Sequence, residues 1–256
     1  MKILATGVLS GLGKYIYENL GGIGVTKSTS VEEFEKIKRD GVDVIIHCAF
    51  NSQMDVSSDS LYQYFNDNVL LTNRLVAISH KKFIFFSTVD LYPKNSDVHV
   101  EDELINLDKV RGIYATTKLI SEAIVREKCH NFLILRPTTL LGKYSRRNTL
   151  VKITEGETET LFLSGDSRFN YVLYSDILGF IKFSISKDIQ GIFNVASTGN
   201  ILLSDVANLL RKKVVFGTHV YEVGNISNAK ITALFPEFKK TSKEVLDQFA
   251  GIFENE

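Results

Sequence analysis

Tyr114 and Lys118 lie four residues apart in the segment Tyr114-Ala115-Thr116-Thr117-Lys118. On a helix this spacing places both side chains on one face, one turn apart, so the lysine ammonium would lie near the tyrosine phenol. A free phenol has a pKa of about 10, and lowering it to about 7 needs roughly 4 kcal/mol. One positive charge at about 4 Å supplies that amount in a partly hydrated site. The pair could therefore exchange a proton with a carbonyl group, although the same spacing also fits an ordinary surface tyrosine.

A glycine-rich segment near the start of the chain gives a second chemical signal. Residues 6–13 read Thr-Gly-Val-Leu-Ser-Gly-Leu-Gly and follow a predicted strand at residues 2–6. In a dinucleotide-binding turn, Gly7 would allow the tight turn, Gly11 would let the backbone approach the pyrophosphate, and Gly13 would allow close packing of helix on strand. The N–H groups at the start of the next helix would then face the phosphates. The alternative is an ordinary glycine-rich loop between a strand and a helix.

The residues after the second predicted strand indicate which dinucleotide binds. An acid at this point holds the ribose 2′-hydroxyl of NAD, whereas a cation accommodates the 2′-phosphate of NADP. The chain has Lys27-Ser28-Thr29-Ser30 here and no acid before Glu32. We therefore expect NADP(H) to be favoured, with NAD(H) possible, and a solvated Lys27 is the alternative.

The apolar pattern predicts alternating strands and helices along most of the chain. Mostly unbroken apolar strands indicate a parallel sheet that is covered on both faces. The sequence therefore predicts the α/β class, with a Rossmann-type doubly wound parallel sheet and a small C-terminal substrate-binding region. The expected strands are residues 2–6, 23–26, 42–47, 83–86, 132–135, 160–163, 171–173 and 192–195, and the expected helices are residues 12–20, 31–39, 60–79, 112–128, 176–186, 204–212 and 242–253.

The bulk composition excludes several classes of protein. The chain has 256 residues, of which 44% are hydrophobic and 23% charged, as expected for a soluble globular domain. Thirty basic and thirty acidic side chains cancel, so neither a nucleic-acid surface nor an anionic membrane surface is expected. No apolar run reaches the roughly 18 residues of a membrane span. Cys48 and Cys129 are the two cysteines and suit a reducing cytoplasm, and the histidines lack the spacing of a metal site.

These motifs, in this order, resemble the short-chain dehydrogenase/reductase superfamily, in the extended branch that acts mainly on nucleotide sugars. The glycine turn has the T-G-x-x-x-G-x-G spacing of the shorter branch, whereas the extended branch usually has T-G-x-x-G-x-x-G. The other segments that carry the resemblance are Val44-Ile45-Ile46-His47-Cys48-Ala49, Asn68, Phe85-Phe86-Ser87-Thr88, the Tyr114/Lys118 pair, Leu135-Arg136-Pro137-Thr138 and Phe193-Asn194-Val195.

The resemblance implies a mechanism of hydride transfer between a nicotinamide and a sugar carbon. Tyr114 would exchange the proton, with its pKa lowered by Lys118 and by the oxidised nicotinamide. Thr88 would hydrogen-bond the reacting oxygen, and Lys118 would also hold the nicotinamide ribose. The expected cofactor contacts are Gly7, Ser10, Gly11, Leu12, Gly13, Lys27, Cys48, Ala49, Asn68, Ser87, Tyr114, Lys118, Arg136, Pro137 and Thr138. Residues 1–142 and 174–196 would form the dinucleotide-binding core, and residues 143–173 and 197–256 the smaller substrate-binding region.

Three functions remain open at this point. Related 4,6-dehydratases carry Asp-Glu directly after the catalytic threonine, but this chain has Val89-Asp90, so dehydration is not expected. The short chain, the short segment before Val42 and Lys27 favour a keto-sugar reductase over a nucleotide-sugar 4-epimerase. A non-catalytic dinucleotide-binding regulatory protein is the third possibility. Proteins of that kind commonly lose the tyrosine or the lysine, and this chain keeps both.

The substrate end and the assembly are predicted from weaker signals. Lys143, Arg146, Arg147 and Arg168 could meet a nucleotide diphosphate, because cationic groups, and planar guanidinium above all, suit phosphate oxygens. A solvated surface is the alternative for each. The resemblance also implies a homodimer that pairs through the helices at residues 60–79 and 112–128, with core packing of these helices as the alternative.

Overall fold

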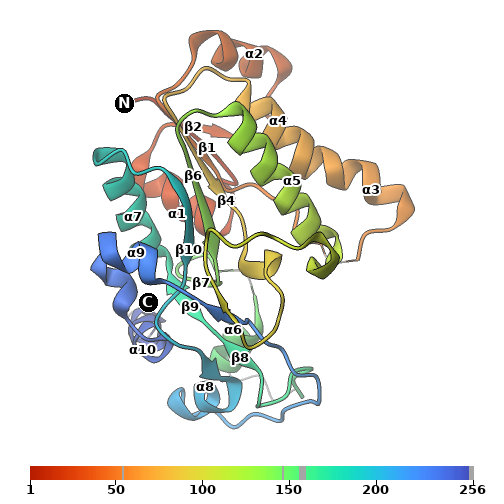
Figure 1. Ribbon diagram of the computed structural model, residues 1–256, viewed down its shortest axis with the longest axis vertical. Helices are drawn as coiled ribbons and strands as arrows, with labels where there is room; N and C mark the ends of the chain where they lie inside the picture. The colour runs from red at the N-terminus through yellow and green to blue at the C-terminus, as the bar shows by residue number, and fades with distance from the viewer. Residues whose placement is uncertain (54, 146, 156–159, 254–256) are drawn as a thin grey trace.

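A six-stranded parallel sheet forms the centre of the computed structural model, which describes residues 1–53, 55–145, 147–155 and 160–253. The strand order is β10-β6-β4-β3-β1-β2 (Figure 1). The strands are β1 (Ile3–Thr6), β2 (Ile23–Val25), β3 (Val44–His47), β4 (Lys82–Phe86), β6 (Phe132–Pro137) and β10 (Gly191–Val195). The chain order reverses between β1 and β3, which is the switch point where open α/β sheets bind ligands. The α/β class and the Rossmann-type doubly wound sheet are thus confirmed.

Helices cover both faces of this sheet (Figure 1). One face carries α2 (Val31–Asp40), α3 (Ser58–Phe65), α4 (Leu71–Val76) and α5 (Gly112–Lys128), and the other carries α1 (Gly11–Leu20), α7 (Tyr174–Ser186) and α9 (Ala229–Leu234). The apolar strands serve both cores because successive side chains point to opposite faces. In β3, for example, Val44 and Ile46 join the core under α1 and α7, whereas Ile45 joins the core under α2 and α5.

A smaller region lies beyond the C-terminal ends of the central strands, at the lower end of Figure 1. It contains α6 (Thr149–Glu155), α8 (Leu203–Leu209), α10 (Ser242–Phe253) and short two-stranded sheets that pair β7 (Thr139–Leu141) with β9 (Tyr171–Leu173), β8 (Arg168–Phe169) with β11 (Ile201–Leu202), and β5 (Val98–His99) with β12 (Asn225–Ile226). Leu150, Phe169, Val206 and Leu246 belong to its separate apolar core. The proposed domain limits stay a prediction, and Ile231 of α9 packs in the core of the main sheet.

Several expected elements differ from the structure. The expected helix at residues 60–79 is three consecutive segments, because a π-helical stretch, η1 (Asn66–Leu70), separates α3 from α4. The expected strand at residues 160–163 is wrong, since Leu163 makes only an isolated bridge with His219. Apolar alternation there reflects packing against the small core rather than a paired strand. The expected strand at residues 171–173 is confirmed as β9, but helices α6 and α9 and the other short strands of the smaller region had no clear signal in the sequence.

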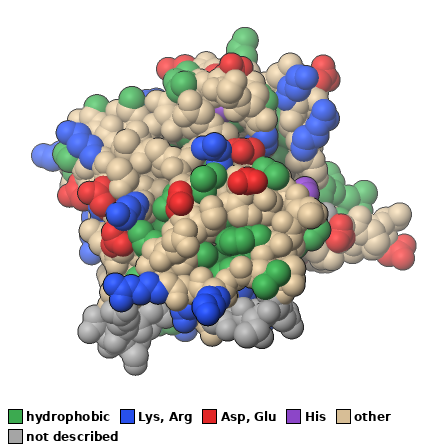
Figure 2. All heavy atoms as spheres, turned by 90° about the horizontal axis from the view of Figure 1, so that it is seen from below, with side chains coloured by type: hydrophobic (Ala, Val, Ile, Leu, Met, Phe, Trp, Pro, Cys, Tyr) green, Lys and Arg blue, Asp and Glu red, His purple; other side chains and the backbone are tan. Residues whose placement is uncertain are grey.

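The surface agrees with the balanced charge of the sequence. Viewed from the smaller region, Figure 2 shows Lys and Arg side chains interspersed with Asp and Glu, around scattered apolar side chains. In the part of the chain that the structure describes, no helix is both long enough and apolar enough to cross a membrane.

Candidate active site

A cavity of about 360 Å³ lies where the chain leaves the C-terminal ends of β1, β3, β4 and β6. Thr88, Tyr114 and Lys118 all line it, so the structure brings the three expected catalytic residues together. The expected cofactor residues that also line it are Gly7, Ser10, Gly11, Leu12, Gly13, Cys48, Ala49, Ser87, Pro137 and Thr138.

The ammonium of Lys118 is held at the end of β4. The side chain is 3% exposed, and Nζ donates a hydrogen bond of 2.5 Å to the backbone carbonyl of Phe86. Nζ also lies 3.6 Å from the ring centroid of Phe50 and 5.9 Å from that of Tyr114. The Phe50 and Tyr114 rings meet edge to face at 5.6 Å. A desolvated cation against an aromatic face is stabilised by the ring quadrupole, so Phe50, which the sequence did not single out, helps to fix the ammonium beside the phenol.

Thr88 follows β4 and caps the short helix η2 (Val89–Leu91). Its Oγ1 accepts a hydrogen bond of 3.1 Å from the Asp90 backbone N–H and donates one of 3.1 Å to Asp90 Oδ2. Asp90 also lines the cavity, and its Oδ1 accepts a bond of 2.8 Å from Lys94 Nζ. A hydroxyl has one hydrogen and two lone pairs. Thr88 therefore directs its hydrogen at Asp90 and keeps one lone pair for a ligand.

The glycines of the first turn are required by its shape. Gly7 has a φ of +74°, and a Cβ there would lie 2.9 Å from the Ala49 backbone nitrogen. A Cβ on Gly13 would lie 2.4 Å from the Gly7 carbonyl oxygen. Gly11, by contrast, starts α1 with a φ of +57°, and a Cβ there would make only ordinary contact, with Tyr174 Oη at 3.6 Å. The turn thus leaves room for a ligand at the positive end of α1.

A buried histidine joins the ends of the two strands that flank the switch point. His47 Nδ1 lies 2.9 Å from Thr6 Oγ1 and its Nε2 lies 3.0 Å from Thr72 Oγ1. Thr6 Oγ1 accepts a hydrogen bond of 3.0 Å from the Ala49 N–H. Burial, with a smaller contribution from the charge of Lys118, lowers the pKa of His47 to about 3. The neutral imidazole therefore acts as a fixed hydrogen-bonding link behind the turn.

Asn68 is placed behind the loop after β3 and is not found among the described residues that line the cavities. Its Oδ1 accepts a hydrogen bond of 2.7 Å from the Asn51 N–H, and its Nδ2 donates one of 3.0 Å to the Asn51 carbonyl. Both ends of the amide are thus used to hold the loop. Asn68 positions the cavity wall in this structure.

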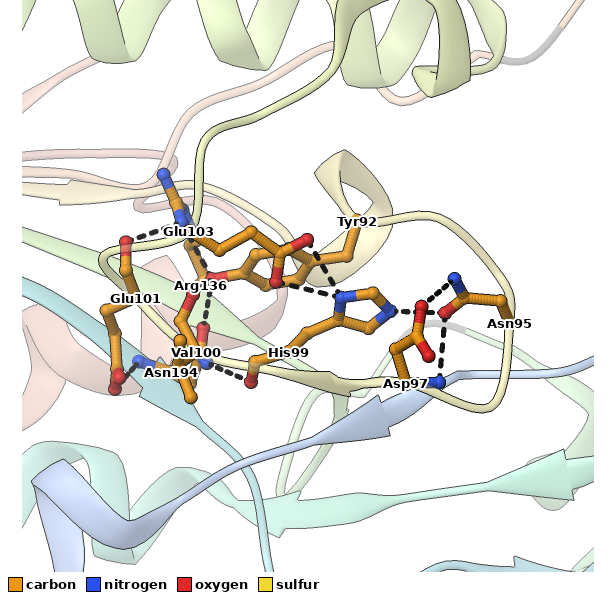
Figure 3. Close-up of polar contacts among 9 residues, drawn as sticks. All are labelled: Tyr92, Asn95, Asp97, His99, Val100, Glu101, Glu103, Arg136 and Asn194. Atoms are coloured by element: carbon orange, nitrogen blue, oxygen red, sulfur yellow. Dashed lines mark hydrogen bonds and ion pairs between the residues drawn. The ribbon is translucent and has the colours of Figure 1, made fainter.

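Arg136 is also away from the cavity surface, in the buried network of Figure 3. It is 2% exposed, and its Nε and Nη2 donate bonds of 3.0 and 2.8 Å to the two oxygens of Glu122. Its Nη1 donates a bond of 2.7 Å to Tyr92 Oη. Burial alone would lower the pKa of Arg136, but Glu122 and Tyr92 raise it above its usual value. Arg136 therefore links β6 to α5 and to the loop after η2.

Two polar groups in the cavity wall, Ser87 and Cys48, were expected to contact a dinucleotide. Ser87 Oγ is buried and has no hydrogen-bond partner among the described residues, although it lines the cavity. A buried hydroxyl of this kind calls for a partner. Cys48 also lines the cavity. Burial raises the pKa of its thiol to about 12, so this thiol stays protonated at neutral pH. The open Gly11 turn and the unpaired Ser87 both fit a bound dinucleotide.

A second cavity of about 1270 Å³ adjoins the first and shares Gly7, Ser10, Ala49 and Phe50 with it. Lys27, which the sequence indicated for the ribose 2′-position of a dinucleotide, lines this second cavity, and its role stays a prediction. The two cavities thus meet at the glycine turn and the loop after β3.

Of the cationic residues proposed for the substrate, the three that the structure describes do not line these cavities. Among the described lining residues, Lys143, Arg147 and Arg168 are not found. Arg147 donates to Glu155 at 3.2 Å, and Arg168 lies 3.5 Å from Glu222, both at the surface. Arg146 lies outside the described residues.

The smaller region contributes other residues to the catalytic cavity. Asn148 and Tyr221 line it opposite the end of β4. Burial raises the pKa of Tyr221, and the charge of Asp90 raises it further, so the phenol lies near that carboxylate. Neither residue was predicted from the sequence, because each belongs to an irregular segment that only the fold brings to the cavity.

Comparisons with known proteins agree with this geometry. Residues 10–196 match the NAD dependent epimerase/dehydratase family. No curated protein matches the chain at a significant level. Among solved structures, a variant of UDP-glucuronic acid 4-epimerase from Bacillus cereus, in complex with UDP-4-deoxy-4-fluoro-glucuronic acid and NAD, is 18% identical with a TM-score of 0.80, covering 100% of this chain and 99% of that one.

Two reductases have the same fold. The dTDP-4-dehydrorhamnose reductase from Clostridium acetobutylicum is 18% identical with a TM-score of 0.82, covering 99% of this chain and 100% of that one. The dTDP-4-dehydrorhamnose reductase from Bacillus anthracis, in complex with NADP, is 18% identical with a TM-score of 0.80, covering 98% and 100%. Because the family match spans most of the chain, the chain belongs to the NAD dependent epimerase/dehydratase family.

Proposed function

We propose that this protein is an NAD(P)-dependent oxidoreductase of a nucleotide-activated sugar, and that it reduces a keto-sugar with Tyr114 as the proton donor. The observation that carries the proposal is that Thr88, Tyr114 and Lys118 line one cavity bordered by the glycine turn. The proposal is supported by the solved structures of similar fold, which include nucleotide-sugar reductases and epimerases.

Each residue of the proposed site has its own chemical role in the reduction. A bound NAD(P)H supplies the hydride. Tyr114 gives its proton to the oxygen as the carbonyl is reduced, and the nearby charge of Lys118 favours the phenolate that remains. Thr88 fixes the position of that oxygen, so the reacting atoms stay aligned. The N-terminus of α1, with the turn around Gly11, holds the pyrophosphate.

For the cofactor we propose a preference for NADP(H) over NAD(H). Lys27, Lys38 and Arg74 line the larger cavity with two carboxylates, Glu35 and Asp67, so its charged lining carries an excess of one positive charge. A 2′-phosphate is favoured by such an excess. The similar solved structures hold NAD in one case and NADP in another, so they support either form.

A 4-epimerase is the second candidate, and one observation favours it. An epimerase starts by oxidising an alcohol. The solved structures of similar fold include a UDP-glucuronic acid 4-epimerase in complex with NAD, and this likeness supports the candidate. In either reaction the hydrogen of the substrate hydroxyl belongs to the exchange with Tyr114, so Thr88 has to turn its own hydrogen from Asp90 toward the reacting oxygen. A non-catalytic regulatory protein is the third candidate, against which the presence of Tyr114 and Lys118 counts.

For the assembly we propose a homodimer in the cytoplasm. Leu61 on α3, Leu70 on η1 and Ile120 on α5 are exposed apolar residues on helices that cover one face of the sheet. Exposed apolar side chains gathered on neighbouring helices are typical of an interface. Cys48 and Cys129 are both free, which suits a reducing compartment.

A panel assay separates the three functions. Purified protein is incubated with UDP- and dTDP-linked sugars and keto-sugars, and NADPH and NADH absorbance is followed while the sugars are separated by chromatography. A reductase consumes one reduced cofactor for each keto-sugar. An epimerase interconverts sugars with no net change in cofactor. Binding of cofactor with no conversion of any sugar in the panel would favour the regulatory protein and contradict the main proposal.

A further inference from the structure

An ion pair lies in the lining of the larger cavity. Lys27, in the loop after β2, donates a hydrogen bond of 2.8 Å from Nζ to Oδ2 of Asp67, in η1. Both residues line the cavity. An acid directly after β2 would mark an NAD site, and the chain has none before Glu32. In the folded chain the carboxylate of Asp67, 40 residues after Lys27, lies beside this loop.

The two charges of this pair differ in mobility. The Lys27 side chain is 82% exposed, so its ammonium can leave at small cost. The Asp67 side chain is 8% exposed and is held by two further donors, Gln63 Nε2 at 2.7 Å and Asn51 Nδ2 at 3.2 Å. Burial alone would raise the pKa of Asp67, but the bonds from Lys27, Gln63 and Asn51 outweigh it and keep the pKa below its usual value. Asp67 is thus a fixed, ionised carboxylate.

Asp67 also keeps capacity for a ligand. Lys27 and Asn51 donate to its Oδ2, whereas Gln63 donates to its Oδ1. A carboxylate oxygen accepts about two hydrogen bonds, so Oδ1 can accept one more. A ribose 2′-hydroxyl can donate that bond. A 2′-phosphate cannot, and its charge would be repelled by the carboxylate.

We infer that Asp67 and Lys27 together select the cofactor: Asp67 accepts the 2′-hydroxyl of NAD(H) and opposes the 2′-phosphate of NADP(H), whereas Lys27 acts in the opposite sense. The inference rests on the proposed binding of a dinucleotide along the glycine turn. In the unaltered protein the two charges largely cancel, so the preference for NADP(H) is small. When either charge is removed, the remaining charge determines which cofactor binds more tightly. The two single variants therefore shift the preference between NADPH and NADH in opposite directions.

The test measures the dissociation constants of NADPH and NADH by titration calorimetry on the full chain. Asp67→Asn keeps the shape of the side chain. It is expected to increase the affinity for NADPH relative to NADH by on the order of tenfold. Lys27→Gln is expected to lower it by a similar factor and to produce a clear preference for NADH. In the double variant the effects oppose each other, so the ratio returns to within about threefold of the unaltered protein.

A matched control uses another surface ion pair. Lys81 and Asp43 lie 2.7 Å apart with the lysine 82% exposed, and neither lines a cavity described above. Lys81→Gln and Asp43→Asn are expected to leave both dissociation constants unchanged. If the ratio of the NADPH and NADH dissociation constants changes as much in these controls as in the Lys27 and Asp67 variants, the inference is overturned. The ratio would then depend on net charge rather than on a local contact.

The outcomes separate this inference from the proposed function. If neither NADPH nor NADH binds the unaltered protein, dinucleotide binding itself is contradicted. If both bind and Asp67→Asn changes their ratio by less than about twofold, the role of Asp67 is contradicted and the proposed function stands. Lys27 is exposed, so Lys27→Gln is expected to fold even where Asp67→Asn does not. A Lys27→Gln protein with no preference for NADH would equally contradict a carboxylate at the 2′-position.

Discussion

At the scale of single residues, His47 shows how a buried titratable group can support a site without taking part in the chemistry. Its imidazole bonds to Thr6 and Thr72, behind the turn that borders the cavity. Burial first, and the charge of Lys118 second, lower its pKa from 6.5 to about 3. The site therefore depends on this histidine staying neutral.

This depression predicts how stability changes with pH. Between about pH 6.5 and about pH 3 the unfolded chain binds a proton at His47 and the folded chain does not, so His47 lowers the stability as the pH falls through this range. The loss is about 1.4 kcal/mol for each pH unit, or roughly 2 kcal/mol at about pH 5. In urea unfolding at about pH 7.5 and about pH 5, His47→Gln is expected to remove that part of the pH dependence. An equal fall in the variant and the unaltered protein would contradict it.

The residues that the sequence predicted for the site are those whose chemistry is local. Tyr114 and Lys118 are one helical turn apart, and the glycines of the first turn follow a strand directly, so their spacing was informative once the family resemblance supported it. Thr88, Pro137 and Thr138 were expected from the resemblance alone. Asp67 and Tyr221, by contrast, have no motif partner close to them in the sequence. Their places depend on how a helix and an irregular segment fold back over the sheet, and spacing carries no signal for that.

At the scale of elements, the π-helix η1 is the clearest departure from the predicted structure. The apolar stripe at residues 60–79 fits a continuous α-helix, and the interruption between α3 and α4 has a tertiary cause. Asn68 in η1 turns its amide to the Asn51 backbone, and Thr72 Oγ1 donates to the Asn68 carbonyl at 2.8 Å. Single-turn π segments are common at functional sites, and this one holds a wall of the larger cavity.

The buried ion pair between Glu122 of α5 and Arg136 of β6 gives a prediction for the way elements are joined. Removing one partner of a buried ion pair leaves an uncompensated charge and costs about 3–5 kcal/mol, whereas replacing both by apolar groups is often near neutral. Glu122→Leu is therefore expected to destabilise the protein strongly, and Glu122→Leu with Arg136→Met is expected to recover most of the loss in urea unfolding. Glu155→Gln, in an exposed pair with Arg147, is the control and should cost below about 1 kcal/mol. A double variant as unstable as Glu122→Leu would contradict this account.

At the scale of the whole molecule, the sheet order explains why the site is where it is. The strand order reverses between β1 and β3, so the loops after these strands part and leave the cavities between them. The alternation of strands and helices was enough to predict this arrangement. The smaller region was predicted less well, because its strands have two or three residues and derive their conformation from packing rather than from local pattern.

The proposed dimer is tested at this scale. Leu70 is exposed on η1, and a carboxylate buried at an apolar interface without a partner is strongly unfavourable. Leu70→Glu is therefore expected to convert a dimer into a monomer in light scattering. Val215→Glu, at an exposed apolar residue of the smaller region, is expected to leave the molar mass unchanged. A monomer in the unaltered protein, or an unchanged dimer in Leu70→Glu, would contradict the proposed interface.

The most direct measurement is the turnover of Tyr114→Phe together with its affinity for NADPH, using whichever keto-sugar the unaltered protein reduces. The substitution removes only the phenolic oxygen, so the glycine turn and the packing of Phe50 against the ring are kept. The account predicts an unchanged dissociation constant for NADPH and a fall in kcat of between about a hundredfold and ten-thousandfold, which is the range for loss of a general acid. Turnover close to that of the unaltered protein would contradict the assignment of Tyr114 as the proton donor.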